Sequence, residues 1–301
     1  MSLIGSHATV TGGLATGGLG YAEAVGAEVI QVFVSNPRGW AAGPGDQEQD
    51  ARLRESGIPV FIHATYMINL GSGNPEVAAR SADALGHALR RGAEIGARGV
   101  VVHTGSAAGW PAAGWPAAGW PAAGGPGGPG PREQAPREQA LRQLGDTVLP
   151  LLDKLGDNDP DLLFEPMAGQ GQMLCARAGE LAGYLSAVDC HPKAGICLDT
   201  CHLFAAGHDL TAPDGVTAVL GELAALPAGH AGVKLVHAND SLLGCGSKRD
   251  RHETIGAGKI GTEPFRALLA ALPEVPFVVE TPGGKAGHAR DIATLKGLRV
   301  Q

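Results

Sequence analysis

Several apolar runs in this sequence end on a side chain that can bind a metal ion. A His, Asp or Glu follows each short, mostly apolar run, at the point where a strand would end. A carboxylate in such a place would be buried at a large cost in free energy unless it were paired or bound to a cation. The six clear cases are His63, His103, Glu165, Asp199, His237 and Glu280, and His7 near the N-terminus is a weaker seventh.

Two short motifs add further ligand candidates. Asp199 and His202 belong to an Asp-Thr-Cys-His motif and can reach neighbouring ions, although the same pair also suits a helix N-cap with a partner His. Asp250 and His252 flank Arg251. In an extended segment, positions i and i+2 point to the same side, so this carboxylate and imidazole can grip one ion together. The alternative for the second motif is an ordinary solvated run of charges.

Taken together, these candidates are too many for a single ion, since zinc takes about four ligands. The set therefore predicts two or three ions, with one carboxylate shared between two of them. Mixed imidazole and carboxylate ligands suit Zn²⁺, and Mn²⁺ is the second choice. The candidate ligands are His63, His103, Glu165, Asp199, His202, His237, Asp250, His252 and Glu280.

The elements that must position these residues alternate between strands and helices. Strands are expected near 3–7, 29–34, 59–63, 99–103, 161–165, 194–199, 232–237 and 276–280, and helices at 46–56, 75–95, 133–155, 178–187 and 263–272. Eight strands with helices between them predict a single (β/α)8 TIM barrel, in which all carboxyl ends of the strands face one mouth. A doubly wound sheet is the alternative, but it would gather ligands mainly at one switch point.

One segment does not fit the barrel pattern. A Gly-Trp-Pro-Ala-Ala sequence occurs three times in residues 109–123, and a tract rich in Gly and Pro follows it. Such composition cannot bury enough apolar surface to fold alone. We therefore expect one domain, residues 1–301, interrupted by a disordered insertion at 107–135 on the catalytic face. The repeated tryptophans could instead stack on nucleic-acid bases.

The bulk composition sets looser limits. The chain has 301 residues and a net charge of −7, which argues weakly against nucleic acid as a partner. Three divalent cations would make the mouth of the barrel locally positive, so the negative net charge does not exclude a nucleic-acid partner. Five cysteines without framework spacing are expected to be reduced, and no run is long enough to span a membrane. We expect a cytoplasmic monomer without an obligate protein partner.

The motifs resemble those of the endonuclease IV family of apurinic/apyrimidinic endonucleases, which are trinuclear zinc barrels of base-excision repair. The resemblance covers nearly the whole chain outside the 109–140 insertion. It is carried by the sequences Phe-Ile-His-Ala-Thr-Tyr at 61–66, Val-His-Thr-Gly-Ser at 102–106, Glu-Pro-Met-Ala-Gly-Gln-Gly at 165–171, Leu-Asp-Thr-Cys-His at 198–202, Val-His-Ala-Asn-Asp at 236–240, Asp-Arg-His at 250–252 and Val-Glu-Thr at 279–281.

The resemblance implies how the ligands divide among three ions. His63, His103 and Glu165 would hold one zinc. Glu165, which is thereby the catalytic bridging ligand, would reach a second ion held by Asp199, His237 and Glu280, and His202, Asp250 and His252 would hold the third. The residues that it implies for DNA binding are Arg38, Tyr66, Gln170 and Arg251.

The implied activity is hydrolysis of the phosphodiester 5′ to an abasic site in duplex DNA, which leaves a 3′-hydroxyl and a 5′-deoxyribose phosphate. Two features depart from the family pattern. Pro166 and Met167 replace the polar pair that usually follows the bridging Glu, which bears on hydrogen bonding there. The tryptophan insertion does not occur in the family pattern. A related barrel that isomerises or epimerises sugars with one or two divalent metals is the main alternative. A DNA-damage binder without catalytic activity is another.

Overall fold

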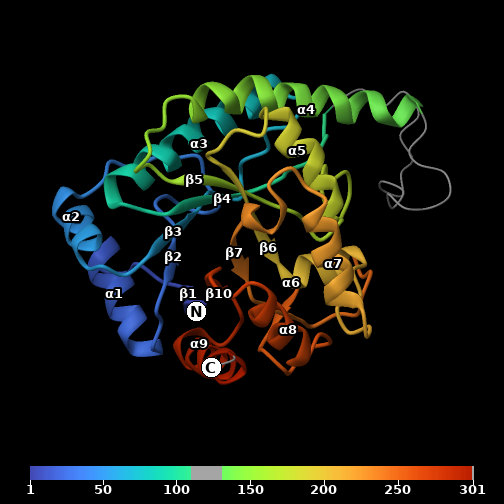
Figure 1. The fold of residues 1–301 in the computed structure, drawn as a ribbon. Helices are drawn as coiled ribbons and strands as arrows, with labels where there is room; N and C mark the ends of the chain where they lie inside the picture. The colour runs from blue at the N-terminus through green and yellow to red at the C-terminus, as the bar shows by residue number, and fades with distance from the viewer. Residues whose placement is uncertain (110–130, 300–301) are drawn as a thin grey trace.

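The computed structural model describes residues 1–109 and 131–299, and in this part of the chain eight parallel strands close into a barrel ringed by helices (Figure 1). Because the sheet is closed, the predicted (β/α)8 barrel is confirmed and the doubly wound sheet is excluded. In order around the barrel, the strands are β1 (Ile4–His7), β10 (Phe277–Val279), β7 (Val233–His237), β6 (Ala194–Asp199), β5 (Asp161–Glu165), β4 (Gly99–His103), β3 (Val60–His63) and β2 (Ile30–Val32).

Helices lie between the strands in sequence and around them in space (Figure 1). The five predicted helical stretches correspond to α2, α3, α4, α5 and α8, whereas α1, α6, α7 and α9 were not singled out from the sequence. The helices are α1 (Leu14–Val25), α2 (Gln47–Glu55), α3 (Pro75–Ile95), α4 (Pro131–Leu152), α5 (Leu181–Ala187), α6 (Thr200–Ala206), α7 (Gly215–Ala224), α8 (Glu263–Ala271) and α9 (Gly284–Leu298), with short 3₁₀ turns at Ala178–Glu180 and Gly229–Gly232.

Helix α3 shows how local sequence sets these boundaries. The side chain of Asn74 accepts hydrogen bonds from the backbone N–H groups of Glu76 and Val77, and Pro75 occupies the first turn. This arrangement satisfies N–H groups that the helix itself leaves free. At the other end Gly96 adopts the left-handed conformation (φ 68°), in which a side chain would be strained. The next strand, β4, then starts only a few residues later.

The barrel interior is filled by one layer of apolar side chains. Val29, Phe61, Val101, Leu163, Cys197, Leu235 and Val278 form this layer, and a separate, larger core lies between the strands and the helices. Successive side chains of a strand point to opposite faces, so residues two positions apart share a face. Two positions beyond each interior residue stands Gln31, His63, His103, Glu165, Asp199, His237 or Glu280. We call this second layer, together with His7 of β1, the upper layer.

A short hairpin departs from the simple barrel pattern. Strands β8 (Asp240–Ser241) and β9 (His252–Glu253) pair in antiparallel fashion in the loop that follows β7. The hairpin brings Asp250 and His252 to the carboxyl ends of the barrel strands. Of the segment that was expected to be extended, His252 lies in β9, and Asp250 precedes the strand.

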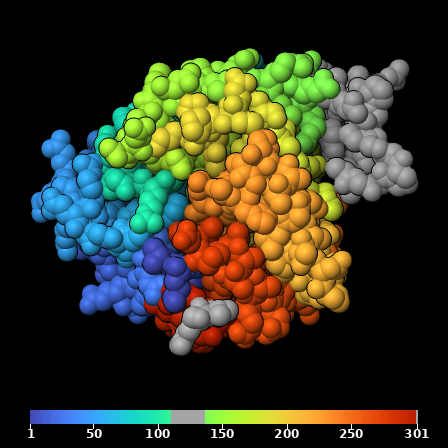
Figure 2. All heavy atoms as spheres, in the orientation of Figure 1, coloured from blue at the N-terminus to red at the C-terminus, as the bar shows by residue number. Residues whose placement is uncertain are grey.

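The predicted insertion at 107–135 falls mainly on residues 110–130, which lie outside the described residues. At its flanks, Ala107 is buried and α4 begins at Pro131. The two ends of the described chain lie side by side, since β1 pairs with β10 and the guanidinium of Arg299 donates to the carbonyl of Ser2 (Figure 2). No helix in the described part of the chain is both long and apolar enough to cross a membrane.

Candidate metal centre

Glu165 lies at the centre of the upper layer, and its two carboxylate oxygens face different partners. Oε2 lies 3.4 Å from Nε2 of His63 and 3.5 Å from Nε2 of His103. Oε1 lies 3.1 Å from Nδ1 of His237 and 3.3 Å from Nδ1 of His202. Ligands about 2.0–2.1 Å from a tetrahedral zinc are roughly 3.3 Å apart, so the separations to His63, His103 and His237 match the edges of a ligand cage. The carboxylate is thus placed to face two ions, one on each side.

A second group of ligand candidates surrounds His237. Its Nδ1 lies 3.4 Å from Oε2 of Glu280 and 4.0 Å from Oδ2 of Asp199, in addition to the contact with Glu165. These four side chains come from β5, β6, β7 and the end of β10. They can hold one cation between them.

A third group combines the hairpin with α6. Nε2 of His202 lies 3.3 Å from Oδ2 of Asp250, and Nε2 of His252 lies 3.0 Å from Oδ1 of the same carboxylate. The imidazole of His252 is also 3.5 Å from Oδ2 of Asp199, so Asp199 stands between the second and third groups. The structure therefore brings all nine predicted ligands together in three overlapping sets.

Several ligand atoms of the cluster are buried without a hydrogen-bond partner in the described part of the chain, as is expected where a cation binds. Among the described residues, Oε2 of Glu165 and the Nε2 atoms of His202 and His252 are buried without a hydrogen-bond partner. Such atoms are costly to bury unless an ion satisfies them. The other ring nitrogens face fixed acceptors: Nδ1 of His63 lies 2.7 Å from the carbonyl of Ala64, and Nδ1 of His202 lies 3.0 Å from that of Pro166.

These backbone contacts direct the free lone pair of each imidazole toward the carboxylates. The departure from the family pattern at Pro166 does not remove this support, because a proline still supplies the carbonyl that orients His202. On the chemistry of its donors, the cluster could hold divalent metal ions.

The electrostatics of the cluster favour added positive charge. Burial opposes a proton on His252, but Asp199 and Asp250 outweigh it and raise the pKa of His252 to about 9. Burial likewise opposes the charged form of Glu165, yet the charge of His237 and hydrogen bonds with His202 and His237 hold its pKa well below the usual range. Burial lowers the pKa of His103 to about 4, which keeps this imidazole neutral and able to donate its lone pair. The cavity thus attracts either protons or metal ions.

Two thiols lie close to the cluster. Cys197 is within reach of Glu165 and His237, and Cys201 adjoins Asp199. Burial raises the pKa of both thiols to about 12, so they stay protonated near neutral pH.

The residues predicted to bind DNA lie on loops at the carboxyl ends of the strands. Tyr66 is 47% exposed, and its ring stacks on that of His103 with centroids 5.5 Å apart. Arg38 is exposed on the loop after β2, and this loop contacts Tyr66 through the carbonyl of Pro37, which accepts from the Tyr66 N–H at 3.0 Å. Arg251 is exposed beside the ligand candidates of the hairpin. Gln170, in the loop after β5, is half-buried, and its Oε1 has no hydrogen-bond partner among the described residues.

Sequence reasoning missed two buried carboxamides, Gln31 and Asn239, that contact the ligand candidates. Gln31 donates to Glu280 and accepts from His237, and Asn239 donates to Asp199. The signal for Gln31 was a lone polar residue two positions after Val29 in an apolar strand.

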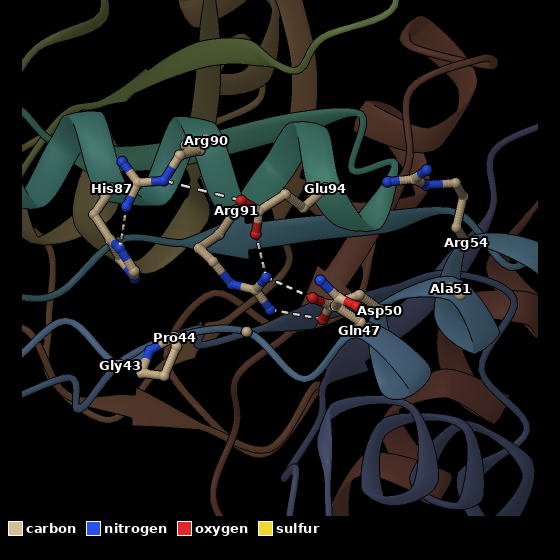
Figure 3. Close-up of a pocket in the computed structure, with 11 residues that line it drawn as sticks. Gly43, Pro44, Gln47, Asp50, Ala51, Arg54, His87, Arg90, Arg91 and Glu94 are labelled. Atoms are coloured by element: carbon tan, nitrogen blue, oxygen red, sulfur yellow. Dashed lines mark hydrogen bonds and ion pairs between the residues drawn. The ribbon is translucent and has the colours of Figure 1, made fainter.

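A cavity lies away from this centre, on the outside of the barrel between α2 and α3 (Figure 3). Its volume is about 500 Å³, and Arg54, Arg90 and Arg91 line it together with Asp50 and Glu94. The guanidinium of Arg91 is already held by both carboxylates. None of the predicted site residues lines this cavity.

Comparisons with known proteins agree with the barrel architecture. The family model of the xylose isomerase-like TIM barrel matches residues 19–298. A protein from Streptomyces coelicolor named "Probable endonuclease 4" is 49% identical over 303 residues, which cover 98% of this chain and 95% of the relative.

Solved structures give the same result. The crystal structure of endonuclease IV from Thermus thermophilus has a TM-score of 0.74 and 31% identity, and the match covers 98% of both chains. A 3-keto-D-glucoside 4-epimerase from E. coli has a TM-score of 0.66 at 16% identity, over 99% of this chain and all of the other. At that identity the likeness to the epimerase concerns the fold alone.

Proposed function

Because the chain belongs to the endonuclease 4 family of xylose isomerase-like TIM barrels and is a DNA-cleaving hydrolase, we propose that it hydrolyses the phosphodiester 5′ to abasic sites in duplex DNA. The products are a 3′-hydroxyl and a 5′-deoxyribose phosphate, as in base-excision repair. The observation that carries the proposal is the cluster of nine imidazoles and carboxylates, in which both oxygens of Glu165 face separate ligand groups.

The proposed cofactor is Zn²⁺, about three ions per chain, with Mn²⁺ as an alternative at one site. The first ion would be held by His63, His103 and Glu165. The second would be held by Glu165, Asp199, His237 and Glu280. The third would be held by His202, Asp250 and His252. Bound divalent ions supply an acidic water as nucleophile at neutral pH and neutralise charge on the phosphate and the leaving oxygen. Imidazole and carboxylate donors without thiolate suit these metals.

The remaining roles fall to exposed side chains around the mouth. An abasic nucleotide has no base to stack, so turning it out of the duplex costs little free energy, which favours damaged over intact DNA. Tyr66 and Arg38 would fill the gap left in the duplex, and Arg251 and Gln170 would contact the DNA. The upper layer then receives the phosphodiester in a buried setting, where electrostatic interactions are stronger than in water. Free cysteines at all five positions are consistent with the expected cytoplasmic location.

A duplex with a single tetrahydrofuran site tests the proposal. The zinc-loaded protein should nick it 5′ to the lesion, whereas Glu165→Gln should be at least about 100-fold slower, because ion-dependent stabilisation of several kcal/mol is lost. Glu76→Gln is the matched control, since Glu76 is exposed on α3 and pairs with Arg80 on the surface. Equal single-turnover rates for wild type and Glu165→Gln would overturn the bridging role.

The same preparations address the alternative of a sugar isomerase or epimerase. The third ligand group, His202 with Asp250 and His252, goes beyond the one or two metals of such enzymes. We therefore expect about three ions per chain by elemental analysis and no turnover of ketoses or aldoses. Turnover of a sugar without cleavage of abasic DNA would favour the isomerase. Binding of abasic DNA without any cleavage would favour the inactive binder.

A further inference from the structure

The upper layer contains one barrel residue that is neither acidic nor basic. Strand β2 contributes Gln31, which stands two positions beyond Val29 of the interior layer and is fully buried. A buried carboxamide needs hydrogen-bond partners for two donors and one acceptor oxygen. In this layer the available partners are mostly the metal-ligand candidates themselves.

Gln31 makes directional contacts with three of its neighbours. Its Oε1 lies 2.9 Å from Nε2 of His237, and its Nε2 donates to Oε1 of Glu280 at 2.7 Å. The same Nε2 lies 3.1 Å from Nδ1 of His7. Accepting from the Nε2–H of His237 leaves the Nδ1 lone pair of that ring directed at Glu165 and Glu280. The amide therefore sets both the tautomer and the ring orientation of one ligand while it holds a second.

Asn239, like Gln31, makes hydrogen bonds with members of this ligand group. Its Nδ2 donates to Oδ2 of Asp199 at 2.7 Å and lies 3.5 Å from Oε2 of Glu280. Its Oδ1 accepts from the backbone N–H of Glu280 at 2.8 Å, and its own N–H donates to the hydroxyl of Thr200. Like Gln31, Asn239 is fully buried.

A neutral amide is the side chain that this position can accommodate. A lysine or arginine there would compete with a cation for the carboxylates, and another carboxylate would add to the repulsion among those already present. A carboxamide donates to an acid and accepts from an imidazole without changing the charge of the cavity.

We propose that Gln31 and Asn239 are positioning residues that preset His237, Glu280 and Asp199 as a cage for one cation, the ion that Glu165 would share. This inference rests on the proposed metal-dependent function. Both amides are fully buried, so the proposal gives them no contact with the substrate. Their contribution is to hold three ligands at cage distances before the ion arrives, which is the role that outer hydrogen bonds play at metal sites.

The test compares two substitutions of Gln31. Gln31→Met keeps the length of the side chain but removes the carboxamide, and Gln31→Asn keeps the carboxamide but withdraws it by one methylene from both ligands. Each zinc-loaded variant is dialysed against increasing chelator concentrations, and the ions per chain are counted by elemental analysis. Both variants should lose one ion at a chelator concentration roughly 10–100-fold lower than wild type. Binding of an abasic duplex should be unchanged, while kcat falls.

Gln49→Met is the matched control. Gln49 accepts from the backbone N–H groups of Ala15 and Thr16 at the start of α1. Its loss should lower the melting temperature but leave ion retention as in wild type. If Gln31→Met does not fold, Gln31→Asn carries the comparison, since it leaves only a small cavity.

The outcomes separate the two proposals. If wild type retains its ions and both Gln31 variants retain them equally well, the positioning role is wrong although the proposed function stands. If wild type binds no ions and leaves abasic DNA intact, the proposed function itself fails. If the Gln31 variants lose one ion early and the Gln49 control does not, the positioning role is supported.

Discussion

Residues two positions apart on one strand lie in different layers of this barrel, one apolar and one polar. Leu163 packs in the apolar interior layer, whereas Glu165, on the same face of β5, reaches the ligand cluster. The strand alternation that fixes this spacing is a local property of the backbone. Which residue ends up in the polar layer is decided by where the strand stops, since only its carboxyl end faces the mouth.

The carboxylate of Asp240 is hydrogen-bonded to backbone N–H groups. This fully buried carboxylate accepts hydrogen bonds from the N–H groups of Ser241, Gly256, Gly258, Ile260 and Gly261. It thereby closes the loop that follows β9 onto the hairpin. We predict that Asp240→Asn lowers the free energy of unfolding by about 2–4 kcal/mol, because a donor replaces an acceptor facing amide donors.

Urea unfolding measures this effect, with Asp157→Asn as the control. Asp157 is exposed on the loop before β5, so its change should stay within roughly 0.5 kcal/mol. A similarly small effect of Asp240→Asn would mean that the loop does not depend on the carboxylate.

At the scale of elements, α2 and α3 are joined by a buried ion pair. The guanidinium of Arg91 donates to both oxygens of Asp50 at 2.6 Å, and it also contacts Glu94 (Figure 3). Gly45 lies so close that a Cβ there would stand 1.9 Å from Nη1 of Arg91. A larger residue at position 45 would therefore have to displace the guanidinium of Arg91 from the pair.

We predict that Arg91→Met destabilises the protein by about 3–5 kcal/mol, because it leaves the carboxylate of Asp50 buried without its partner. The double variant Arg91→Met/Asp50→Leu should recover a large part of this loss, since an apolar pair needs no compensating charge. Thermal unfolding of the single and double variants measures both effects. If the double variant were as unstable as the sum of the singles, the pairing would not be the cause.

At the scale of the whole molecule, the cations and the fold are expected to stabilise each other. Four carboxylates and five imidazoles converge from both halves of the chain, and buried atoms of Glu165, His202 and His252 have no hydrogen-bond partner among the described residues. An ion bound only by the folded chain contributes about 2.7 kcal/mol at a free concentration 100 times its Kd.

Removal of metal should therefore lower the melting temperature by roughly 4 °C per ion under those conditions. Differential scanning calorimetry before and after chelation measures the change, and adding Zn²⁺ back should restore it. Glu165→Gln should show a smaller shift than wild type, because it weakens two ligand groups at once. Identical melting temperatures with and without metal would contradict ion binding by the folded cluster.

The sequence alone predicted most of the fold. The barrel strands were located to within about two residues of their observed limits, because short apolar runs with a polar end are a strong local signal. Helix α1 was not singled out, since Thr16, Gly17 and Gly18 in its interior are weak helix formers. Packing of its buried face against the barrel decides its conformation. The same applies to the glycine-containing α7 and α9 and to the short α6.

What the sequence determined by itself is the chemistry: nine imidazoles and carboxylates at strand and loop ends predict a site for several cations, because those residue types bind zinc wherever they meet. What only the tertiary structure decided is the partnership of each side chain. Glu165 faces two groups, Gln31 holds His237, and Asp240 closes a loop, because closure of the barrel and the stagger of its strands set distances between residues that the sequence places far apart.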